Sequence, residues 1–397
     1  MRILVCSPGF MPAQSAGGPP FSTFNLCKGL RSAGADVRVV TTDWNGPTRL
    51  DVPTDCWTNY DEIPVWYARN RGGPIMYSPS GARAIAEWMP RVDCVINSGT
   101  LWFHLGFASW RAAIRHRTPS LTYVRGLLDP WAFNFKPVRK RVYWRLVGKR
   151  ILRDSTVVVA LTESERQAIR AQNVSTRIEV VPNGASVDLG GSSRTLLESA
   201  FPALSAHRYV LFLGRIHAKK ALDVLLEAIA LYRAEDSDTR FVVAGPVDLE
   251  YMRDWRQLLD RFGLNGSLVT PGPVSGALKA ALFEYADVFV LPSRSEGLPV
   301  AALEALAAGC PVVITKQCNL PEVEEARAGI IVEPDATQVV SAMRALLNDE
   351  DRRRAMSENA RVLARESFDW DVIAQRIMTL CGELIRERAP RQTLLAS

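Results

Sequence analysis

The feature that most constrains the fold is an alternation of short apolar runs with stretches of helical spacing, which continues along nearly the whole chain. In the first half the strand-like runs are RILVC (2–6), DVRVVTT (36–42), DCVINS (93–98), SLTYV (120–124), STVVVALT (155–162) and RIEVVPN (177–183). The segment between the first two runs has the apolar spacing of a helix that ends at Gly34. A strand, a glycine-bearing loop, a helix and a further strand in this order predict a parallel sheet.

A second alternation fills the other half of the chain. Its strand-like runs are RYVLFLGR (208–215), TRFVVAG (239–245), SLVTPG (267–272), DVFVLPS (287–293) and PVVIT (311–315), and the stretches between most of them have helical spacing. We therefore predict two Rossmann-like, doubly wound α/β domains, 1–185 and 208–367, joined by a Gly- and Ser-rich linker, 186–207. The domains are expected to face a central cleft, because ligands of such sheets bind beyond the carboxyl ends of the strands.

The composition argues against several classes of protein. Of the 397 residues 47% are hydrophobic and 23% charged, and no apolar stretch reaches the roughly 18 residues of a membrane span. The first residues, MRILVCSPGF, contain an apolar run too short for the core of a signal peptide, so we expect a cytoplasmic protein. Seven cysteines without a C-x-x-C pair fit reduced thiols, and four scattered histidines argue against a zinc site.

The charge is unevenly distributed along the chain. Residues 1–190 contain 24 Lys and Arg against 14 Asp and Glu, a net charge of +10, whereas the remainder carries −4. The segment KPVRKRVYWRLVGKRILR (136–153) has eight basic residues and no acidic one, with apolar residues at about helical spacing. These apolar residues are Val138, Val142, Leu146 and Ile151.

We expect this apolar stripe to pack on the sheet and the basic face to contact an anionic membrane, peripherally and on the inner face of the cytoplasmic membrane. The basic residues assigned to the contact are Lys140, Arg141, Arg145 and Lys149. The alternative is an ordinary solvated helix. Nucleic acid is not expected as a partner, because the chain has no motif that reads it.

The stretch LPSRSEGLPVAALEALAAGCPVVIT carries the first candidate site. Gly297 permits an unusual turn, Pro299 suits the first turn of a helix, and Gly309 suits its carboxyl cap. The free amides and the dipole of this helix favour an anion such as phosphate at its amino end. Glu296 lies just before that end and Glu304 two turns inside, where each carboxylate can accept from hydroxyls of a nucleotide sugar. The alternative is that both are solvated helix carboxylates.

A second cluster follows the run RYVLFLGR. The strand is expected to end at Gly214, with Arg215 and Lys220 in the following turn and first helical residues, on the same side of the sheet as Glu296. A fixed guanidinium and an ammonium would there neutralise a diphosphate leaving group, whose developing charge is the main electrostatic problem in glycosyl transfer. Taken alone, the two cations also fit a solvated helix start, and their combination with the carboxylates favours the binding site.

The segments FLGRIHAKKALD, FVVAG, PGPVSG, ADVFVLPSRSEGLPVAALEALAAGCPVV and VVPNGASVD together resemble the retaining glycosyltransferases of family 4 (glycosyl transferases group 1), which have the GT-B fold. The resemblance covers nearly the whole chain and is strongest from 208 to 333. GLLDPW is similar to a segment of members from bacterial polysaccharide assembly. The resemblance implies transfer of a hexose from a UDP- or GDP-linked sugar to a glycan or polyprenyl-diphosphate-linked acceptor. It also implies that a final helix, 368–390, crosses back to the first domain.

The resemblance assigns roles to individual residues. Arg215 and Lys220 would bind the donor diphosphate and Glu296 the donor sugar at the reaction centre, as the three catalytic residues. The other donor-binding positions would be Gly17 and Gly18 in the loop SAGGPPF, Gly214, Val274 near the base, Gly297 and Leu298 near the sugar and phosphates, and Glu304 at the ribose. No metal or other cofactor is expected, because the two cations and the helix amides would stabilise the leaving diphosphate.

One position departs from the family pattern. Many members have a histidine on the first-domain side of the donor, near the place where this chain has Arg125. Arg125 is expected either to bind phosphate or acceptor or to pair with Asp129, and Asn183 is assigned with it to the acceptor side. Two alternatives stay open: an enzyme of another class on the same fold, such as a nucleotide-sugar epimerase, and a non-catalytic partner that binds nucleotide sugar. A phosphorylase would need a cofactor lysine, for which the sequence gives no signature.

Overall fold

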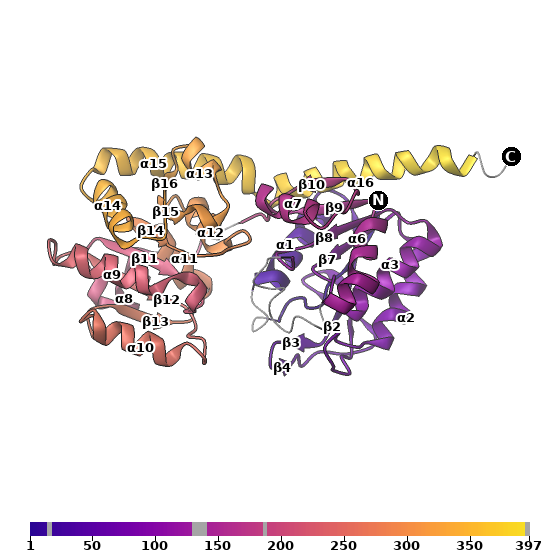
Figure 1. Cartoon of the computed structure of the whole chain (residues 1–397), viewed down its shortest axis with the longest axis horizontal. Coiled ribbons are helices and arrows are strands. Elements are labelled where there is room, and N and C mark those ends of the chain that lie inside the picture. The colour runs from indigo at the N-terminus through magenta and orange to yellow at the C-terminus, as the bar shows by residue number, and fades with distance from the viewer. Residues whose placement is uncertain (14–17, 129–140, 186–188, 394–397) are drawn as a thin grey trace. The chain divides into compact units, whose positions relative to one another are not determined.

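The computed structural model describes residues 1–13, 18–128, 141–185 and 189–393, of which 389–393 are described by their backbone alone. The chain divides into two compact units (Figure 1). The first unit combines Met1–Gly184 with Trp370–Ser397, and the second is Ala185–Asp369. Each unit is built on its own sheet, as the two alternations in the sequence predict.

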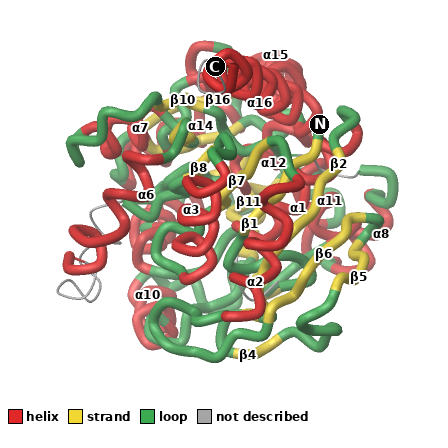
Figure 2. Tube along the Cα trace, turned by 90° about the vertical axis from the view of Figure 1, so that its right-hand side faces the viewer, coloured by secondary structure: helices red, strands yellow, loops and turns green. Residues whose placement is uncertain are grey.

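The first unit contains an eight-stranded sheet with the strand order β10-β9-β8-β7-β1-β2-β6-β5. All pairings in it are parallel except that of β5 with β6, and Figure 2 shows β2, β6 and β5 side by side. Its strands are β1 (Arg2–Cys6), β2 (Asp36–Thr42), β5 (Trp57–Tyr60), β6 (Ile63–Ala68), β7 (Cys94–Ser98), β8 (Ser120–Tyr123), β9 (Val157–Ala160) and β10 (Ile178–Val180), with a separate small pair, β3 (Trp44–Asn45) and β4 (Thr48–Arg49). Each run predicted in this half forms one of these strands.

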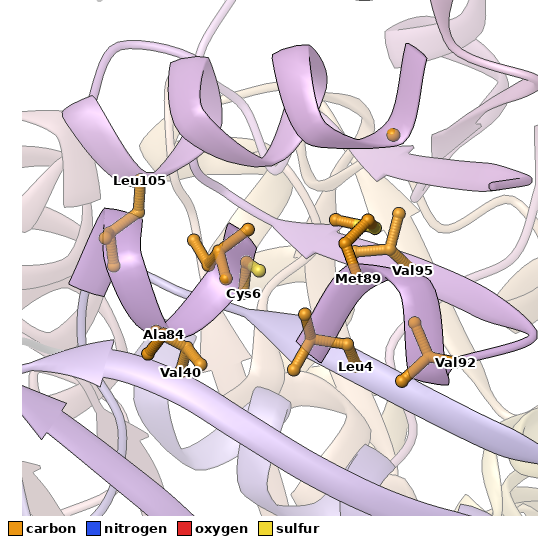
Figure 3. Packing of buried hydrophobic residues seen from close by; sticks show 10 residues of the cluster. Leu4, Cys6, Val40, Ala84, Met89, Val92, Val95 and Leu105 are labelled. Atoms are coloured by element: carbon orange, nitrogen blue, oxygen red, sulfur yellow. The ribbon is translucent and has the colours of Figure 1, made fainter. Parts of the chain in front are cut away.

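The helices of the first unit are α1 (Gly18–Ser32), α2 (Pro79–Trp88), α3 (His104–His116), α6 (Lys149–Asp154), α7 (Glu163–Arg170) and α16 (Trp370–Thr393). Helices α2 and α3 pack on the sheet through a cluster of buried side chains (Figure 3). The cluster consists of Leu4, Cys6, Val40, Ala84, Ile85, Met89, Val92, Val95, Leu105 and Ala113. Because alternate residues of the strands point to this face, burying the cluster fixes the register of β1, β2 and β7.

Helix α16 returns to the first unit and packs along α1. A Cβ atom on Gly29 of α1 would lie 2.8 Å from Cβ of Ala374 and 2.9 Å from the carbonyl oxygen of Trp370. Only glycine permits this close approach of the two helices. Helix α1 ends at Ser32, and Gly34 follows with a φ of +88°, which agrees with the predicted cap.

The second unit contains a six-stranded parallel sheet with the strand order β13-β12-β11-β14-β15-β16. Its strands are β11 (Tyr209–Leu213), β12 (Arg240–Ala244), β13 (Val269–Gly272), β14 (Val288–Leu291), β15 (Val312–Thr315) and β16 (Gly329–Val332). Its helices are α8 (Arg194–Ala200), α9 (Leu222–Arg233), α10 (Met252–Arg261), α11 (Gly276–Glu284), α12 (Val300–Ala308), α13 (Glu322–Glu325), α14 (Ala336–Leu347) and α15 (Glu350–Leu363). The five runs predicted in this half form β11 to β15.

The expected linker, 186–207, needs a correction. Helix α8 lies inside it and packs on α11, with Leu197 fully buried. Ser193 caps the helix by accepting from the amide of Leu196 at 3.1 Å. The segment lacks a long apolar period because α8 has only seven residues, and a single leucine is enough to anchor it.

Candidate functional site

Each sheet reverses its strand order at an inner pair of strands, and Arg215, Lys220 and Glu296 lie at the reversal of the second unit. In the second unit the order reverses between β11 and β14, and in the first between β7 and β1. Ligands of open parallel sheets bind outside the carboxyl ends of the strands at such a point, because the two following loops diverge there. In the second unit these loops carry Arg215 after β11 and Glu296 after β14.

The loop after β11 is held by close contact with the loop after β12. A Cβ atom on Gly245 would lie 1.9 Å from the carbonyl oxygen of Gly214, and Gly245 has a φ of +134°. Both facts require glycine at position 245. The amide of Gly214 donates to the carbonyl of Ala244 at 3.0 Å, which continues the sheet pairing up to Arg215. The guanidinium of Arg215 is exposed and pairs with no residue in the described part of the chain.

Lys220 and Glu296 form an ion pair at this reversal. The Nζ of Lys220 lies 2.5 Å from Oε1 of Glu296, and the hydroxyl of Ser293 donates to the same oxygen at 2.6 Å. The two charged side chains are only 20% and 13% exposed. Lys220 ends a short 3-10 turn after β11, and Ser293 follows β14 by two residues, so the folding of two adjacent strands brings the pair together.

A second ion pair joins the loop after β14 to the first turn of α9. Arg294 donates two hydrogen bonds to the carboxylate of Asp223, at 2.7 and 2.6 Å, and its amide donates to the carbonyl of Lys219 at 2.9 Å. The guanidinium lowers the pKa of Asp223, and the carboxylate raises that of Arg294. This planar, two-bond contact fixes the position of the loop that carries Glu296.

Helix α12 begins directly after this loop. Its amino-terminal cap is Pro299, and no side chain caps the helix, so its first amides are available to a ligand. A Cβ atom on Gly297 would meet no other atom within 4 Å, whereas the side chain of Leu298 is buried. The predicted carboxyl cap is present at Gly309, with a φ of +78°.

Glu304 lies inside α12 and pairs with a lysine that the sequence did not assign to the site. The Nζ of Lys279, on α11, lies 2.6 Å from Oε1 of Glu304, whose side chain is 5% exposed. Burial raises the pKa of Glu304, and the ammonium of Lys279 opposes that rise. Val274 lies in the loop between β13 and α11, one residue before the amino-terminal cap of α11. The packing of α11 on α12 therefore brings Lys279 to the predicted ribose carboxylate.

Sequence reasoning missed Lys279, Ser293, Asp223 and Asn319. The side-chain amide of Asn319 donates to the carbonyl of Glu296 at 2.7 Å, and so fixes the turn from the other side. One signal was available for Asp223 and Arg294, which have opposite charges and follow the adjacent strands β11 and β14, Asp223 in the first turn of α9 and Arg294 in a loop. The contact of Lys279 depends on the packing of α11 on α12, and those of Ser293 and Asn319 depend on the path of the loops; neither has a local pattern in the sequence.

The first unit brings Arg125 and Asn183 together. The Nη1 of Arg125 donates to Oδ1 of Asn183 at 2.8 Å. Gly18 is the first residue of α1, with open space around the position of a Cβ atom. Gly17 and Asp129 lie outside the described residues, and so does the proposed pairing of Arg125 with Asp129.

In the described part of the basic segment, the expected packing of the apolar stripe on the sheet is wrong for two residues. Val142 and Leu146 are 55% and 57% exposed, so they do not pack on the sheet, whereas Ile151 is buried. Tyr143, Trp144 and Val147 pack on the core in their place. The helix has a π-helical turn over Trp144–Gly148, which inserts one extra residue. Residues after this turn therefore point in a different direction from the one that a uniform α-helical period predicts, and the predicted apolar stripe is wrong here.

The basic residues flank the two exposed apolar side chains. Arg141 and Arg145 are exposed and Lys149 is partly exposed, whereas Lys140 and Val138 lie outside the described residues. Within the described ranges, no helix is both long and apolar enough to span a membrane. The same residues contain no group of three or more His, Cys, Asp and Glu side chains arranged to hold a metal ion.

Comparison with known proteins gives two family matches that together cover most of the chain. Residues 198–363 match the family described as Glycosyl transferases group 1, and residues 16–189 match Glycosyltransferase Family 4. A D-inositol 3-phosphate glycosyltransferase of Salinispora tropica is 30% identical over 95% of this chain and 83% of its own length. A D-inositol 3-phosphate glycosyltransferase of Corynebacterium urealyticum is 28% identical over 60% of this chain, and an uncharacterized glycosyltransferase of Methanocaldococcus jannaschii is 27% identical over 51%. The chain spans 59% and 53% of the length of these two.

Solved structures show the same fold at lower identity. Sucrose-phosphate synthase from Thermosynechococcus elongatus has a TM-score of 0.76 and 20% identity, with 100% of both chains covered. Anabaena HepE, solved in complex with UDP and glucose, has a TM-score of 0.75 and 18% identity, covering 96% of this chain and 100% of its own. These likenesses, together with the two parallel sheets, confirm the predicted fold class.

Proposed function

The chain belongs to the family 4 glycosyltransferases (glycosyl transferases group 1), which have the GT-B fold, and from that premise we propose that it transfers a hexose from a nucleotide-diphosphate sugar to a glycan acceptor. The observation that carries the proposal is the Lys220–Glu296 pair at the strand reversal of the second unit, with Arg215 beside it in sequence. A cation for a leaving diphosphate and a carboxylate for the sugar lie within one hydrogen bond of each other.

The donor would bind with its diphosphate at Arg215, Lys220 and the amino end of α12. Arg215 is the cation without a protein partner among the described residues, so it is available to the diphosphate. Glu296 would exchange part of its contact with Lys220 for hydroxyls of the sugar, and Glu304 would accept from the ribose. Anabaena HepE was solved with UDP and with UDP-glucose, and E. coli trehalose-6-phosphate synthase with UDP-2-fluoro glucose, which supports a UDP-linked donor. A GDP-linked donor is the alternative.

The transfer would proceed with retention of the anomeric configuration. The bond between the anomeric carbon and the diphosphate oxygen breaks, and a hydroxyl of the acceptor forms the new bond on the same face. A diphosphate oxygen takes the proton of that hydroxyl, so the leaving group serves as the base. Glu296 positions the sugar and stabilises its developing positive charge. Lys220 and Arg215 stabilise the charge on the diphosphate, which is the role that a metal ion has in other transferases.

The acceptor would be lipid-linked, in the assembly of a surface polysaccharide. The surface formed by Val142, Leu146, Arg141 and Arg145 supports peripheral contact with an anionic membrane, because two exposed apolar side chains lie beside two exposed guanidinium groups. Each basic residue near such a surface contributes about 1 kcal/mol of attraction.

Vesicle binding tests the membrane contact. We expect replacement of these four residues by Ser to reduce binding to vesicles that contain phosphatidylglycerol, and to leave the weak binding to phosphatidylcholine unchanged. Arg352→Ser with Arg354→Ser, on helix α15 of the second unit, is the control for the loss of positive charge. Equal binding of the four-residue variant and the control to the anionic vesicles would refute the contact.

Donor turnover tests the activity. Purified protein is incubated with UDP-glucose or GDP-mannose, a bacterial glycolipid extract and EDTA, and release of the nucleoside diphosphate is followed. We expect release that depends on the extract and falls at least a hundredfold in Glu296→Gln, while UDP or GDP still binds this variant. Release without any acceptor that yields an isomerised sugar would instead identify an epimerase. Binding of nucleotide without any turnover in the wild type would indicate a non-catalytic partner.

A further inference from the structure

The first unit has a polar cluster of its own at the strand reversal between β7 and β1. It is formed by Thr23 of α1, Ser98 at the end of β7, Arg125 after β8, Glu165 of α7 and Asn183 after β10. These residues come from elements far apart in the sequence, and the parallel sheet brings them to one edge.

Arg125 is held by neutral groups only. Its Nε donates to the hydroxyl of Ser98 at 2.8 Å, and its Nη1 donates to the side-chain oxygen of Asn183 at 2.8 Å. The hydroxyl of Ser98 shares a further hydrogen bond of 2.7 Å with Thr23. The carbon of the guanidinium lies 5.1 Å from the centre of the Tyr123 ring. Among the described residues, none accepts a hydrogen bond from Nη2.

The charge of Arg125 has no counter-ion among the described residues. Glu165 is the carboxylate that interacts with it at longer range, but both oxygens of Glu165 accept from backbone amides, those of Gly126 at 2.5 Å and Leu161 at 2.6 Å. Burial lowers the pKa of Arg125 and raises that of Glu165. A guanidinium stays charged nonetheless, and a half-buried charge without a counter-ion is less favourable than a paired one. An anion bound at Nη2 and at the free hydrogen of Nη1 would remove this cost.

The backbone holds Arg125 in an uncommon conformation. Arg125 has a φ of +53° and Gly126 a φ of +72°, so two successive residues are left-handed. This conformation costs an arginine roughly 1–2 kcal/mol, and such strain persists where the surroundings impose it. Here Glu165 imposes it, because its carboxylate accepts from the amide of Gly126 and ties the turn to α7. The backbone turn at Arg125 and Gly126 directs the guanidinium toward Ser98 and Asn183.

We propose that Arg125 binds a phosphate or diphosphate group of the acceptor, and that Glu165 is the positioning residue that holds it for that contact. The inference rests on the proposed function, since it names the chemistry of the acceptor. Among the described residues, contacts with Ser98 and Asn183 leave three N–H groups of the guanidinium without an acceptor. A phosphate offers enough oxygens to accept from all three. The net charge of +10 on residues 1–190 favours a polyanion over a single carboxylate.

Binding of inorganic phosphate and pyrophosphate by calorimetry tests the role of Arg125. The experiment uses Lys220→Gln as the background, so that the donor site contributes little. We expect Arg125→Gln to weaken pyrophosphate binding at least tenfold in this background, and Arg125→Lys, which keeps the charge without the fork, to weaken it less. Equal binding by the Lys220→Gln protein with and without Arg125→Gln would overturn the proposal. Binding of acetate with the same affinity as phosphate would overturn the assignment to phosphate.

The separate effects of Lys220→Gln and Arg125→Gln distinguish failure of this inference from failure of the proposed function. If Lys220→Gln does not change the binding of UDP or GDP, the proposed donor site fails, but the difference made by Arg125→Gln remains interpretable. If UDP binds as proposed and Arg125→Gln has no effect on pyrophosphate, only the present inference fails.

Glu165→Gln tests the positioning role. A glutamine can accept from one of the two amides but not from both with equivalent oxygens, so the turn at Gly126 loses one of its restraints. We expect pyrophosphate binding in the Lys220→Gln background to weaken severalfold in a protein that stays folded at the temperature of the titration. In the otherwise wild-type protein, we expect unchanged UDP affinity. Glu163→Gln is the matched control, since Glu163 lies two residues away on the same helix, is exposed, and pairs with Arg166 at 2.6 Å. An equal loss in the control, or a parallel loss of UDP affinity in the otherwise wild-type protein, would contradict the role.

The source of the phosphate is distinguished by competition. A water-soluble hexose 6-phosphate and undecaprenyl diphosphate in phosphatidylcholine vesicles are each tested for displacement of pyrophosphate, with and without Arg125. Displacement by the soluble compound supports a sugar phosphate as acceptor, and displacement by the vesicles alone supports a lipid-linked diphosphate. Failure of both compounds to displace pyrophosphate would overturn the assignment to an acceptor.

Discussion

Each of the two carboxylates predicted for the donor site is paired with one lysine. Glu296 pairs with Lys220 and Glu304 with Lys279, and all four side chains are less than a third exposed. Removing one partner of such a pair leaves the other charge enclosed and unbalanced, which is unfavourable. The lysines therefore keep the carboxylates charged and in place, so that hydroxyl groups of a donor meet acceptors that are already formed.

The raised pKa of Glu304 predicts a pH dependence of nucleotide binding. The ribose hydroxyls donate to the charged carboxylate, and protonation removes one acceptor. Affinity should therefore decline on acidification at a higher pH than an ordinary glutamate, with its pKa near 4.5, would give. Calorimetry of UDP from about pH 8 to pH 5 measures the decline, which should be absent in Glu304→Gln. The same decline in both proteins would contradict this origin.

The raised pKa of Glu304 also affects the free energy of unfolding. Acidification favours folding through this group, whereas it weakens nucleotide binding. Because the folded protein holds a proton on Glu304 more tightly than the unfolded chain does, the contribution of this group favours folding at low pH. That contribution is lost as pH rises from the ordinary pKa of 4.5 through the higher pKa of the folded state. Glu304→Gln removes this loss, so its stability relative to the wild type should increase with pH over that window. A constant difference in the free energy of unfolding would contradict the raised pKa.

Lys279→Met tests the Lys279–Glu304 ion pair directly. We expect it to destabilise the protein by ~3 kcal/mol and to weaken UDP binding near neutral pH, because Glu304 loses the charge that opposes its protonation. Lys316→Met is the control, since Lys316 pairs with Glu333 at 2.5 Å on the surface, with side chains 68% and 43% exposed. Solvent screens an exposed pair of this kind, so its loss should change stability little. Equal destabilisation of the two variants in urea unfolding would refute the difference between them.

At the scale of elements, helix α12 depends on its carboxyl cap. Gly309 has a φ of +78°, and its amide donates to the carbonyl of Leu306 at 2.9 Å, which ends the helix and turns the chain toward β15. A Cβ atom at this position would also lie 2.4 Å from the guanidinium carbon of Arg361. The cap thus fixes the end of the element whose other end is proposed to bind the diphosphate.

Gly309→Ala should therefore destabilise the second unit. The left-handed conformation alone costs an alanine roughly 1–2 kcal/mol, and displacement of Arg361 adds to that cost. Gly263→Ala is the matched control, because Gly263 has a φ of +64° but open space around the Cβ position. Urea unfolding should show a loss in both variants and a larger one for Gly309→Ala. A smaller loss at Gly309 would mean that Arg361 moves without cost.

The strands of the two sheets could be predicted from the sequence to different degrees. Fully buried parallel strands read as continuous apolar runs, so β1 and β14 were identified directly. The hairpin of β5 and β6 was missed, because its two-residue turn, Asp61–Glu62, needs a positive φ at both positions. Such turns are recognised in sequences by Asn-Gly or Asp-Gly, and this pair gives no such signal.

At the scale of the whole molecule, the site was predictable where it follows from topology. Arg215, Lys220 and Glu296 follow adjacent strands on either side of the strand reversal, so the alternation of strands and helices places them together. Lys279 meets Glu304 only through the packing of one helix on another, and Glu165 meets Gly126 through a loop contact. Contacts of this second kind depend on side-chain packing in three dimensions, which no local sequence pattern encodes.

The two units should respond differently to nucleotide. If the donor site belongs to the second unit, saturating UDP should slow amide hydrogen exchange in residues 214–220 and 293–304. Exchange in 94–98 and 120–126 of the first unit should change less. Exchange followed by mass spectrometry measures both sets, and Glu304→Ala should reduce the protection in proportion to its loss of affinity. Protection that appears first in the segments of the first unit would contradict the assignment of the donor site.

The measurement that tests the account most directly is calorimetric titration of UDP, GDP, ADP and dTDP, in the presence of EDTA, into the wild type and Glu304→Ala. We expect one nucleotide to bind preferentially without metal, and Glu304→Ala to weaken its binding by ~1–3 kcal/mol, the magnitude of lost hydrogen bonds to a charged group. Absence of binding by all four nucleotides, or equal binding by the two proteins, would contradict the proposed donor site at Glu304.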